Sequence, residues 1–323
     1  MANALDELIH RADLDALVRY VDDTCSERDW DHLVRVRNEA RAAVNSGRQL
    51  WPIATLANYR LALWAPAEQA VRALDDTART FMPGPVSEIL AVHHSWEELE
   101  PHLAPGHDRS LVAYERSIRR DVIEQDEPTL LDIPYDILNW EPQYAIATYT
   151  DNGVESPEPF LNVQWEPLTT REGSPMSDNT VHVFRQMMQS WTAHSNGSAR
   201  AAVVEGELPE ALYALCGINC EVSSITSQEA LASLAWASAS GGAHGKRKGA
   251  ATGRSDAWWL LATFTGLDDE WPCDADELGE ILDELLFFTF AHEKTPATGW
   301  NLSLAIVDPE EGLAVAMEAS DHD

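Results

Sequence analysis

The chain has 323 residues, and its 54 acidic and 22 basic side chains give a formal charge of −32 at pH 7. Apolar residues make up 45% of the chain and charged residues 24%, which is typical of folded globular proteins and argues against disorder over most of the length. Such an acidic protein repels phosphate backbones and anionic lipids, which excludes broad nucleic-acid binding and peripheral membrane attachment unless a local basic patch overrides the charge. A GC-rich coding sequence and a halophile's acidic surface would both give this composition, and the sequence does not choose between them.

The sequence carries no signal for export or membrane insertion. Residues 1–10 have acids where a signal peptide has a basic region followed by an apolar run. No stretch of about 18 apolar residues occurs. The cysteines lie at positions 25, 216, 220 and 273 and are too few to form a disulfide framework for this length. We therefore expect a reduced, cytoplasmic protein without a membrane partner.

Residues 1–125 are predicted to form successive helices, because their apolar residues recur at helical spacing. Stripes run through residues 5–21 and 30–44, and a third consists of Ile53, Leu56, Ala57, Arg60 and Trp64. Further helices are expected at 66–78 and 110–124, with a capping box formed by Ser95 and Glu98 between them. The short connections favour antiparallel neighbours, so we predict an all-α bundle or repeat-like stack, although no fixed repeat period is present.

Residues 126–178 form a proline-rich segment with a different pattern. Strand-like alternation occurs at 143–150 and at 160–165. Four large aromatic residues in this segment argue against a disordered linker. We therefore predict an extended connecting segment with strands, packed on a domain.

Residues 179–323 alternate predicted helices and strands. We expect a helix capped by Asp178 or Asn179, strands at 200–204 and 221–225, a short helix after Pro209, and a helix led by the capping box of Thr226 and Glu229. Further helices are expected at 257–264 and 277–290, and a hairpin joins 300–307 to 313–317. The prediction is an α+β protein, with an all-helical N-terminal domain and a C-terminal α/β domain built on a small mixed sheet.

The most unusual stretch is the loop 241–254, which holds five glycines and four basic residues. Concentrated positive charge attracts an anion, and glycines let backbone N–H groups approach it closely. Trp258 and Trp259 follow this loop and point about 100° apart on a helix, so one of them is expected to reach a pocket or partner surface, unless that helix is buried on two sides. The candidate residues for binding a ligand or partner are His244, Lys246, Arg247, Lys248, Arg254 and Trp258.

This loop matches no established phosphate motif. It is one residue too short for a P-loop and follows a helix, and no window has the spacing of the dinucleotide fingerprint after a strand. The alternative explanation needs no ligand: the cations pair with the nine acidic residues between 268 and 284 in a flexible exposed loop.

No other motif defines a metal or catalytic site. The acidic run fails the EF-hand pattern, and the spacing of His93, His94, His102 and His107 does not suit a metal. Cys216 and Cys220 are one residue farther apart than in a redox or zinc pair, so free buried cysteines are expected. No G-x-S-x-G elbow occurs, and carboxylates are too abundant to single out an acid or base. We predict no metal and no cofactor, and no catalytic residue is assigned.

The leading hypothesis is a non-enzymatic cytoplasmic interaction or adaptor protein that binds another macromolecule, a protein partner, through the loop 241–254. The alternative is a small-molecule enzyme or sensor that binds a phosphate- or carboxylate-bearing ligand there, with His244 as a proton-transfer group. A nucleic-acid mimic rests on net charge alone. Homo-oligomers are compatible with each hypothesis.

Overall fold

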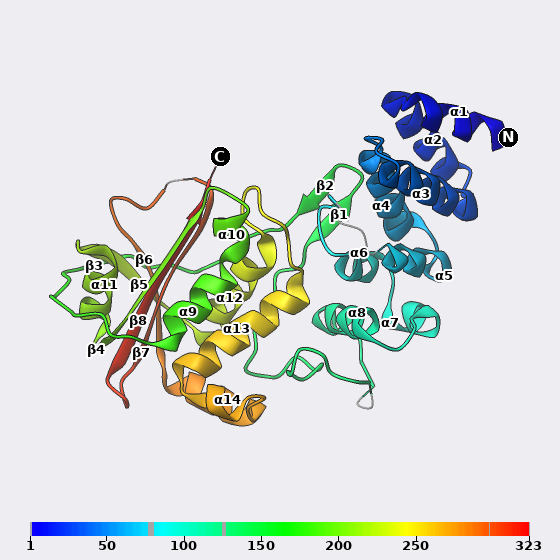
Figure 1. Cartoon of the computed structure of the whole chain (residues 1–323). Helices are drawn as coiled ribbons and strands as arrows, with labels where there is room; N and C mark the ends of the chain where they lie inside the picture. The colour runs from blue at the N-terminus through cyan, green and yellow to red at the C-terminus, as the bar shows by residue number, and fades with distance from the viewer. Residues whose placement is uncertain (1, 77–80, 125–126, 297, 323) are drawn as a thin grey trace. The chain divides into compact units, whose positions relative to one another are not determined.

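The computed structural model describes residues 2–76, 81–124, 127–296 and 298–322. The chain divides into two compact units (Figure 1). Unit 1 comprises Met1–Glu127 and Ala147–Glu155, and unit 2 comprises Pro128–Ile146 and Ser156–Asp323. The predicted connecting segment, 126–178, contributes to both units.

Unit 1 is helical apart from one short hairpin. Its helices are α1 (Ala2–Arg11), α2 (Leu14–Ser26), α3 (Trp30–Asn45), α4 (Trp51–Trp64), α5 (Ala67–Ala70), α6 (Val86–His93), α7 (Trp96–Leu99) and α8 (His107–Ile118), with 3₁₀ turns η1 (Val71–Asp75) and η2 (Glu100–His102). The hairpin pairs β1 (Thr148–Thr150) with β2 (Gly153–Glu155). The stripe at 5–21 is two helices, because Ala12 adopts a positive φ of 51° and Asp13 caps α2. The end of the predicted helix 66–78 lies outside the described residues.

Helix α4 is the centre of unit 1 and packs against α2, α3, α5 and α6. It is buried on nearly every side between Ile53 and Leu63. A helix buried all round needs apolar residues on every face, and α4 meets this requirement at most positions. Arg60 is the charged exception in its middle. The predicted capping box of Ser95 and Glu98 is present at the start of α7.

Unit 2 is built on one six-stranded sheet. Its strands are β3 (Glu166–Leu168), β4 (Ser198–Glu205), β5 (Cys220–Ile225), β6 (Leu286–Ala291), β7 (Trp300–Asp308) and β8 (Leu313–Asp321), in the order β3-β5-β6-β7-β8-β4. The predicted α+β class is confirmed, but the sheet is not mixed: all five pairings between the described strands are antiparallel. Helix α11 (Leu208–Cys216) connects β4 to β5, and such a helical connection could have produced a parallel pair. In this sheet β6, β7 and β8 lie between these two strands, so β4 and β5 do not pair with each other.

Helices cover both faces of this sheet (Figure 1). Helix α11 packs on one face. On the other face, α9 (Asn179–Met187), α10 (Gln189–Ala193) and α12 (Ser227–Ser240) contact the sheet, and α13 (Ala250–Phe264) packs against α9 and α12. The turn η3 (Leu267–Glu270) and α14 (Ala275–Glu284) complete the unit. No helix in the described part of the chain combines the length and the apolar character needed to span a bilayer.

Two expected elements differ from the structure. The helix predicted at 277–290 ends at Glu284, and residues 286–291 form β6. This aromatic-rich run, L-F-F-T-F-A, has no distinguishing periodicity, and pairing with two strands decides its structure. The strand expected at 160–165 is absent, and β3 begins just after it, at Glu166.

Candidate functional site

The glycine-rich loop between α12 and α13 closes on residues of its own unit. The backbone N–H of Ala243 donates to Asp321 Oδ2 at 2.7 Å, and Ser195 Oγ donates to Asp321 Oδ1 at 2.8 Å. Gly242 is required here because a Cβ at its position would lie 2.2 Å from Asp321 Oδ2. One loop amide therefore approaches an anion closely, and that anion is the fully buried carboxylate of Asp321.

The loop's basic side chains do not form one exposed cluster. Lys248 Nζ lies 2.9 Å from Asp256 Oδ2, and the buried Arg247 donates through Nη1 to Ser156 Oγ at 2.9 Å. Lys246 and His244 are exposed. The surface of the loop thus offers one lysine and one histidine to a partner.

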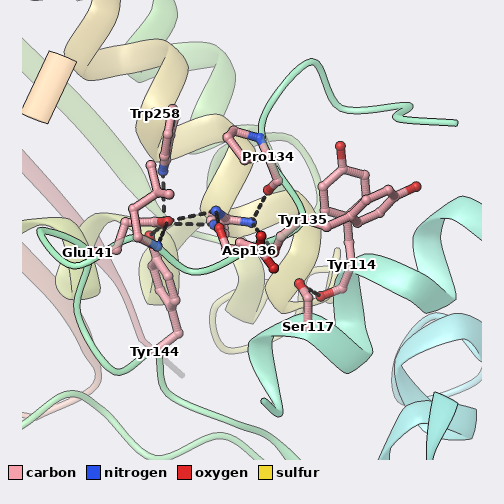
Figure 2. A network of polar contacts seen from close by, with 10 residues as sticks. Tyr114, Ser117, Pro134, Tyr135, Asp136, Glu141, Tyr144 and Trp258 are labelled. Atoms are coloured by element: carbon pink, nitrogen blue, oxygen red, sulfur yellow. Dashed lines mark hydrogen bonds and ion pairs between the residues drawn. The ribbon is translucent and has the colours of Figure 1, made fainter. Parts of the chain in front are cut away.

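Arg254 and Trp258 lie in the interior of unit 2. Figure 2 shows Trp258 and Tyr144 directed toward Glu141 in the polar network around them. Arg254 donates to both carboxylate oxygens of Glu141 at 2.7 and 2.6 Å and to the carbonyls of Pro134 and Asp136. Trp258 Nε1 donates to Glu141 Oε2 at 3.0 Å. The sequence predicts that both residues contact a ligand or partner, and the structure corrects this. Their polar groups instead bind the segment 134–141 and attach it to α13.

The alternative explanation of the loop is corrected as well. Cations of the loop do pair internally, but with Glu141 and Asp256 instead of the acidic run 268–284. Burial alone would lower the pKa of Arg254, yet the hydrogen bonds and charge of Glu141 raise it. Burial and the charge of Glu141 also raise the pKa of Tyr144, which donates to the same carboxylate. This network joins the segment 134–141 to α13 and is structural.

Unit 1 contains a cavity of about 540 Å³ where three helices end and one begins. Its lining comes from the end of α2, the turn before α3, the end of α4 and the residue after α6. We call it the Arg60 cavity, for the side chain that adjoins it. The lining residues are Cys25, Ser26, Arg28, Trp30, Trp64, Ala65, Pro66 and His94.

Arg60 is a buried cation without adequate partners. Its side chain is 11% exposed, and Nε and Nη1 have no hydrogen-bond partner among the described residues. Nη2 lies 3.7 Å from Asp22 Oδ1, too far for a good hydrogen bond. The guanidinium lies 4.3 Å from the ring centroid of Trp64, and its charge acts on the thiol of Cys25. Arg60 therefore lies next to two residues that line the cavity, Trp64 and Cys25.

Two further nitrogen-bearing side chains belong to the cavity. His94 Nε2 is buried and has no partner among the described residues, and burial lowers the pKa of this imidazole against the opposing charge of Glu98. The exposed side chain of Arg28 makes no ion pair or hydrogen bond within the described chain. Arg28 also has a φ of +58°, a conformation that favours glycine. Arg28 and His94 thus line the cavity, and Arg60 lies next to its lining residues Cys25 and Trp64.

Other buried arginines in unit 1 are better satisfied. Arg37 Nη1 donates to Asn58 Oδ1 at 2.9 Å and to the carbonyl of Arg72 at 2.7 Å. Arg41 and Arg119 each have one nitrogen without a partner among the described residues. However, Arg41 Nη2 lies 2.6 Å from a carboxylate oxygen of Asp76, and Arg119 Nη1 lies 2.8 Å from one of Glu115. Arg60 differs because no group of the described chain lies in good hydrogen-bonding distance of its guanidinium. The sequence signal was its place in the apolar stripe of α4, which gave no reason to suspect a ligand.

A larger cavity, in unit 2, has a different chemistry. It measures about 910 Å³ and lies between residues 142–146, 157–162 and the start of α12. Its charged lining residues are Glu158 and Glu229, and Glu229 is occupied in the capping box of α12. Burial raises the pKa of Glu158. This groove has no cation for an anionic ligand.

The fold and the Arg60 cavity define an α+β protein whose helical N-terminal unit carries a pocket bordered by cations. The chain belongs to the DUF6183 family, a family of unknown function, whose model matches residues 15–323. No curated protein and no solved structure matches the chain. The matched residues include the whole lining of the Arg60 cavity.

Proposed function

We propose that this protein is a non-catalytic binding protein that holds a small anionic ligand in the Arg60 cavity. The observation that carries the proposal is the pair of unpartnered nitrogens on the buried guanidinium of Arg60. A buried donor left unpaired costs roughly 1–3 kcal/mol, and more when it is charged. A phosphate or carboxylate in the cavity would neutralise this charge, and a shift of the side chain toward the cavity would let one of these nitrogens donate to the anion.

The aromatic lining supports a ligand with a planar group beside its anionic end. Trp30 and Trp64 both line the cavity, and Trp64 is 44% exposed. Tryptophan offers a large apolar face on which a ring stacks. An aryl phosphate or an aromatic carboxylate combines both features. In a molecule with a charge of −32, a local group of cations is also the main means of attracting such a ligand.

Binding without catalysis is favoured by the state of the cavity's nucleophile. Burial raises the pKa of Cys25 to about 11, although Arg60 opposes this shift. The thiolate is the reactive form of cysteine, so at neutral pH this side chain stays a thiol of low reactivity. The ligand class is the one that the alternative hypothesis assigned to the loop 241–254, and we now place it in unit 1. A macromolecular partner at that loop would meet Lys246 and His244.

The test removes one cation from the cavity without disturbing the fold. Arg28→Gly deletes an exposed cation and places glycine at a positive φ, so the folded state is kept. Arg120→Gly is the matched control, because Arg120 is also exposed in unit 1, has a φ of 73° and does not line the cavity. Phenyl phosphate is titrated into each protein by calorimetry, with inorganic phosphate in parallel.

We expect wild type and Arg120→Gly to bind phenyl phosphate with equal affinity. Arg28→Gly should bind it about tenfold more weakly, because it loses one charge-assisted contact. Inorganic phosphate should bind more weakly than phenyl phosphate, since it cannot use the indole rings. Equal affinity of the two glycine variants, or no heat with either anion, would contradict the proposal.

A further inference from the structure

Four sulfur-, nitrogen- and oxygen-bearing side chains meet at one end of the sheet face that α11 covers. Cys216 ends α11, Cys220 begins β5, His292 follows the last residue of β6, and Glu318 lies on β8. The register between β5 and β6 ends at the pair of Glu221 with Ala291, and Cys220 and His292 are the next residues beyond that pair. The remainder of this face is an apolar core that includes Leu208, Leu212, Val222, Phe290, Ala305 and Ala316.

Three of these side chains already lie at distances that suit a shared ion. Sγ of Cys216, a ring nitrogen of His292 and a carboxylate oxygen of Glu318 are all within 4.8 Å of one another. His292 Nε2 lies 2.8 Å from Glu318 Oε1, and the two side chains are 2% and 10% exposed. The buried Cys220 belongs to the core cluster against which Cys216 packs. A polar cluster in an apolar core calls for a specific role.

We propose that this cluster is a zinc site, with Cys216, His292 and Glu318 as ligands and Cys220 in the fourth position. Thiolate, imidazole and carboxylate are the groups that bind zinc in proteins, with four tetrahedral ligands in structural sites. The ligands come from α11, β5, the end of β6 and β8. A bound ion would therefore fasten the helix to three strands of the sheet.

The charges of the cluster balance with zinc bound. Two thiolates, one carboxylate and Zn²⁺ sum to a single negative charge, and Arg200 Nη2 lies 2.5 Å from Glu318 Oε2 to offset it. Glu318 Oε1 contacts His292, and Glu318 Oε2 accepts a hydrogen bond from Arg200. Arg200 therefore fixes the orientation of the ligand Glu318. Zinc binding would displace the thiol protons of Cys216 and Cys220.

Coordination also changes the proton on His292. The backbone N–H of Lys294 donates to Nδ1 at 3.1 Å, so the ring proton is assigned to Nε2, where it faces Glu318. Binding through Nε2 transfers this proton to Nδ1, and the Lys294 amide, in the turn after β6, must turn away. Each zinc ion therefore releases two protons, one from Cys216 and one from Cys220, while the imidazole stays neutral.

Cobalt(II) tests this site in the full-length, reduced protein, because it takes the same ligands as zinc and has visible bands. We expect one Co²⁺ per chain, a thiolate-to-cobalt charge-transfer band, tetrahedral ligand-field bands, and two protons released per ion. Zinc should displace the cobalt and raise the melting temperature by linkage. Cys25→Ser and Cys273→Ser are the matched controls and should retain every signal, since neither cysteine belongs to the cluster.

Cys216→Ser and His292→Gln should each weaken cobalt binding at least tenfold, and Cys216→Ser should also reduce the charge-transfer band to that of one thiolate. Cys220→Ser should retain a weaker band from the single remaining thiolate, so it tests the site even if the Cys216 variant unfolds. Absence of a charge-transfer band in wild type, or a band that survives Cys216→Ser unchanged, would overturn the proposal. The anion titrations in unit 1 are independent of this result.

Discussion

Two buried arginines, one in each unit, show opposite solutions to the same physical problem. Arg254 in unit 2 is fully buried and bonded to both oxygens of Glu141 and to backbone carbonyls (Figure 2). Arg60 in unit 1 is 9% exposed and leaves two of its nitrogens without a partner in the described chain. Desolvating a guanidinium is costly, and only complete pairing offsets that cost.

The difference between the two identifies which cation is available to a ligand. The Glu141–Arg254 pair completes its own hydrogen bonds, so it stabilises one arrangement of unit 2 and has no donor to spare. Arg60 has donors to spare, beside a cavity. Local charge density in the sequence pointed to the first arginine, while hydrogen-bond completeness points to the second.

The largest effect should come from breaking the complete network. Glu141→Ala leaves Arg254 buried without a counter-charge, and we expect unit 2 to lose about 3–5 kcal/mol of unfolding free energy, measured by urea denaturation. Replacing both partners with apolar residues, as in Glu141→Leu with Arg254→Met, should cost much less. A Glu141→Ala variant as stable as wild type would remove the structural role of this pair.

The glycine loop should behave as structure and not as a ligand site. Gly242→Ala places a Cβ against Asp321 at a φ of +70°, and we expect a loss of about 1–3 kcal/mol in chemical denaturation. Gly312→Ala is the matched control, since Gly312 has a φ of +64° and open space around it. If both variants lose the same stability, the contact with Asp321 contributes nothing beyond the backbone strain.

The periodicity of apolar residues predicted many of the helices correctly. The stripes of α3 and α4 and the capping boxes at Ser95 and Thr226 were sufficient to place those helices. The antiparallel sheet and the strand at 286–291 depend on pairing between distant segments, which local patterns do not contain. The end of α1 was missed because a single positive-φ residue, Ala12, breaks an otherwise continuous stripe.

The candidate site was far less accessible to sequence reasoning. The sequence showed that the loop 241–254 is rich in cations, but the partners of those cations, Glu141 and Asp256, follow from the fold. Arg60 lies in an apolar stripe, as Arg37 does in α3, and spacing cannot tell a satisfied buried arginine from an unsatisfied one. Likewise, the strands that bring His292 and Glu318 to Cys216 are separated widely along the chain.

A smaller effect distinguishes the two arginines directly. Arg60→Met removes an unsatisfied charge, so the free protein should stay within about 1 kcal/mol of wild type, the cost of the lost contact with Trp64. Arg254→Met alone should be strongly destabilising, because it leaves Glu141 buried and unpaired. Urea midpoints for the two variants measure this contrast, and equal losses would contradict our account of Arg60.

The smallest effect concerns pH and His94. Burial lowers the pKa of His94 in the folded state below its ordinary value of about 6.5, so the unfolded chain binds more protons as the pH falls through that value. The stability of wild type relative to His94→Gln should therefore be highest above pH 6.5 and fall as the solution is acidified. Phenyl phosphate in the cavity should reduce this fall by favouring the protonated imidazole. A stability difference that is independent of pH would place His94 outside any titrating role.

The most direct measurement of an anion at Arg60 is a crystal structure of the protein soaked with selenate, an oxyanion that scatters anomalously. We expect an anomalous peak for a selenate whose oxygen accepts a hydrogen bond from Arg60 Nη1 or Nε in the wild-type crystal, and loss of that peak in Arg60→Met. Ordered water alone at both nitrogens, with no anomalous signal in the cavity, would show that solvent satisfies Arg60 and that no anion belongs there.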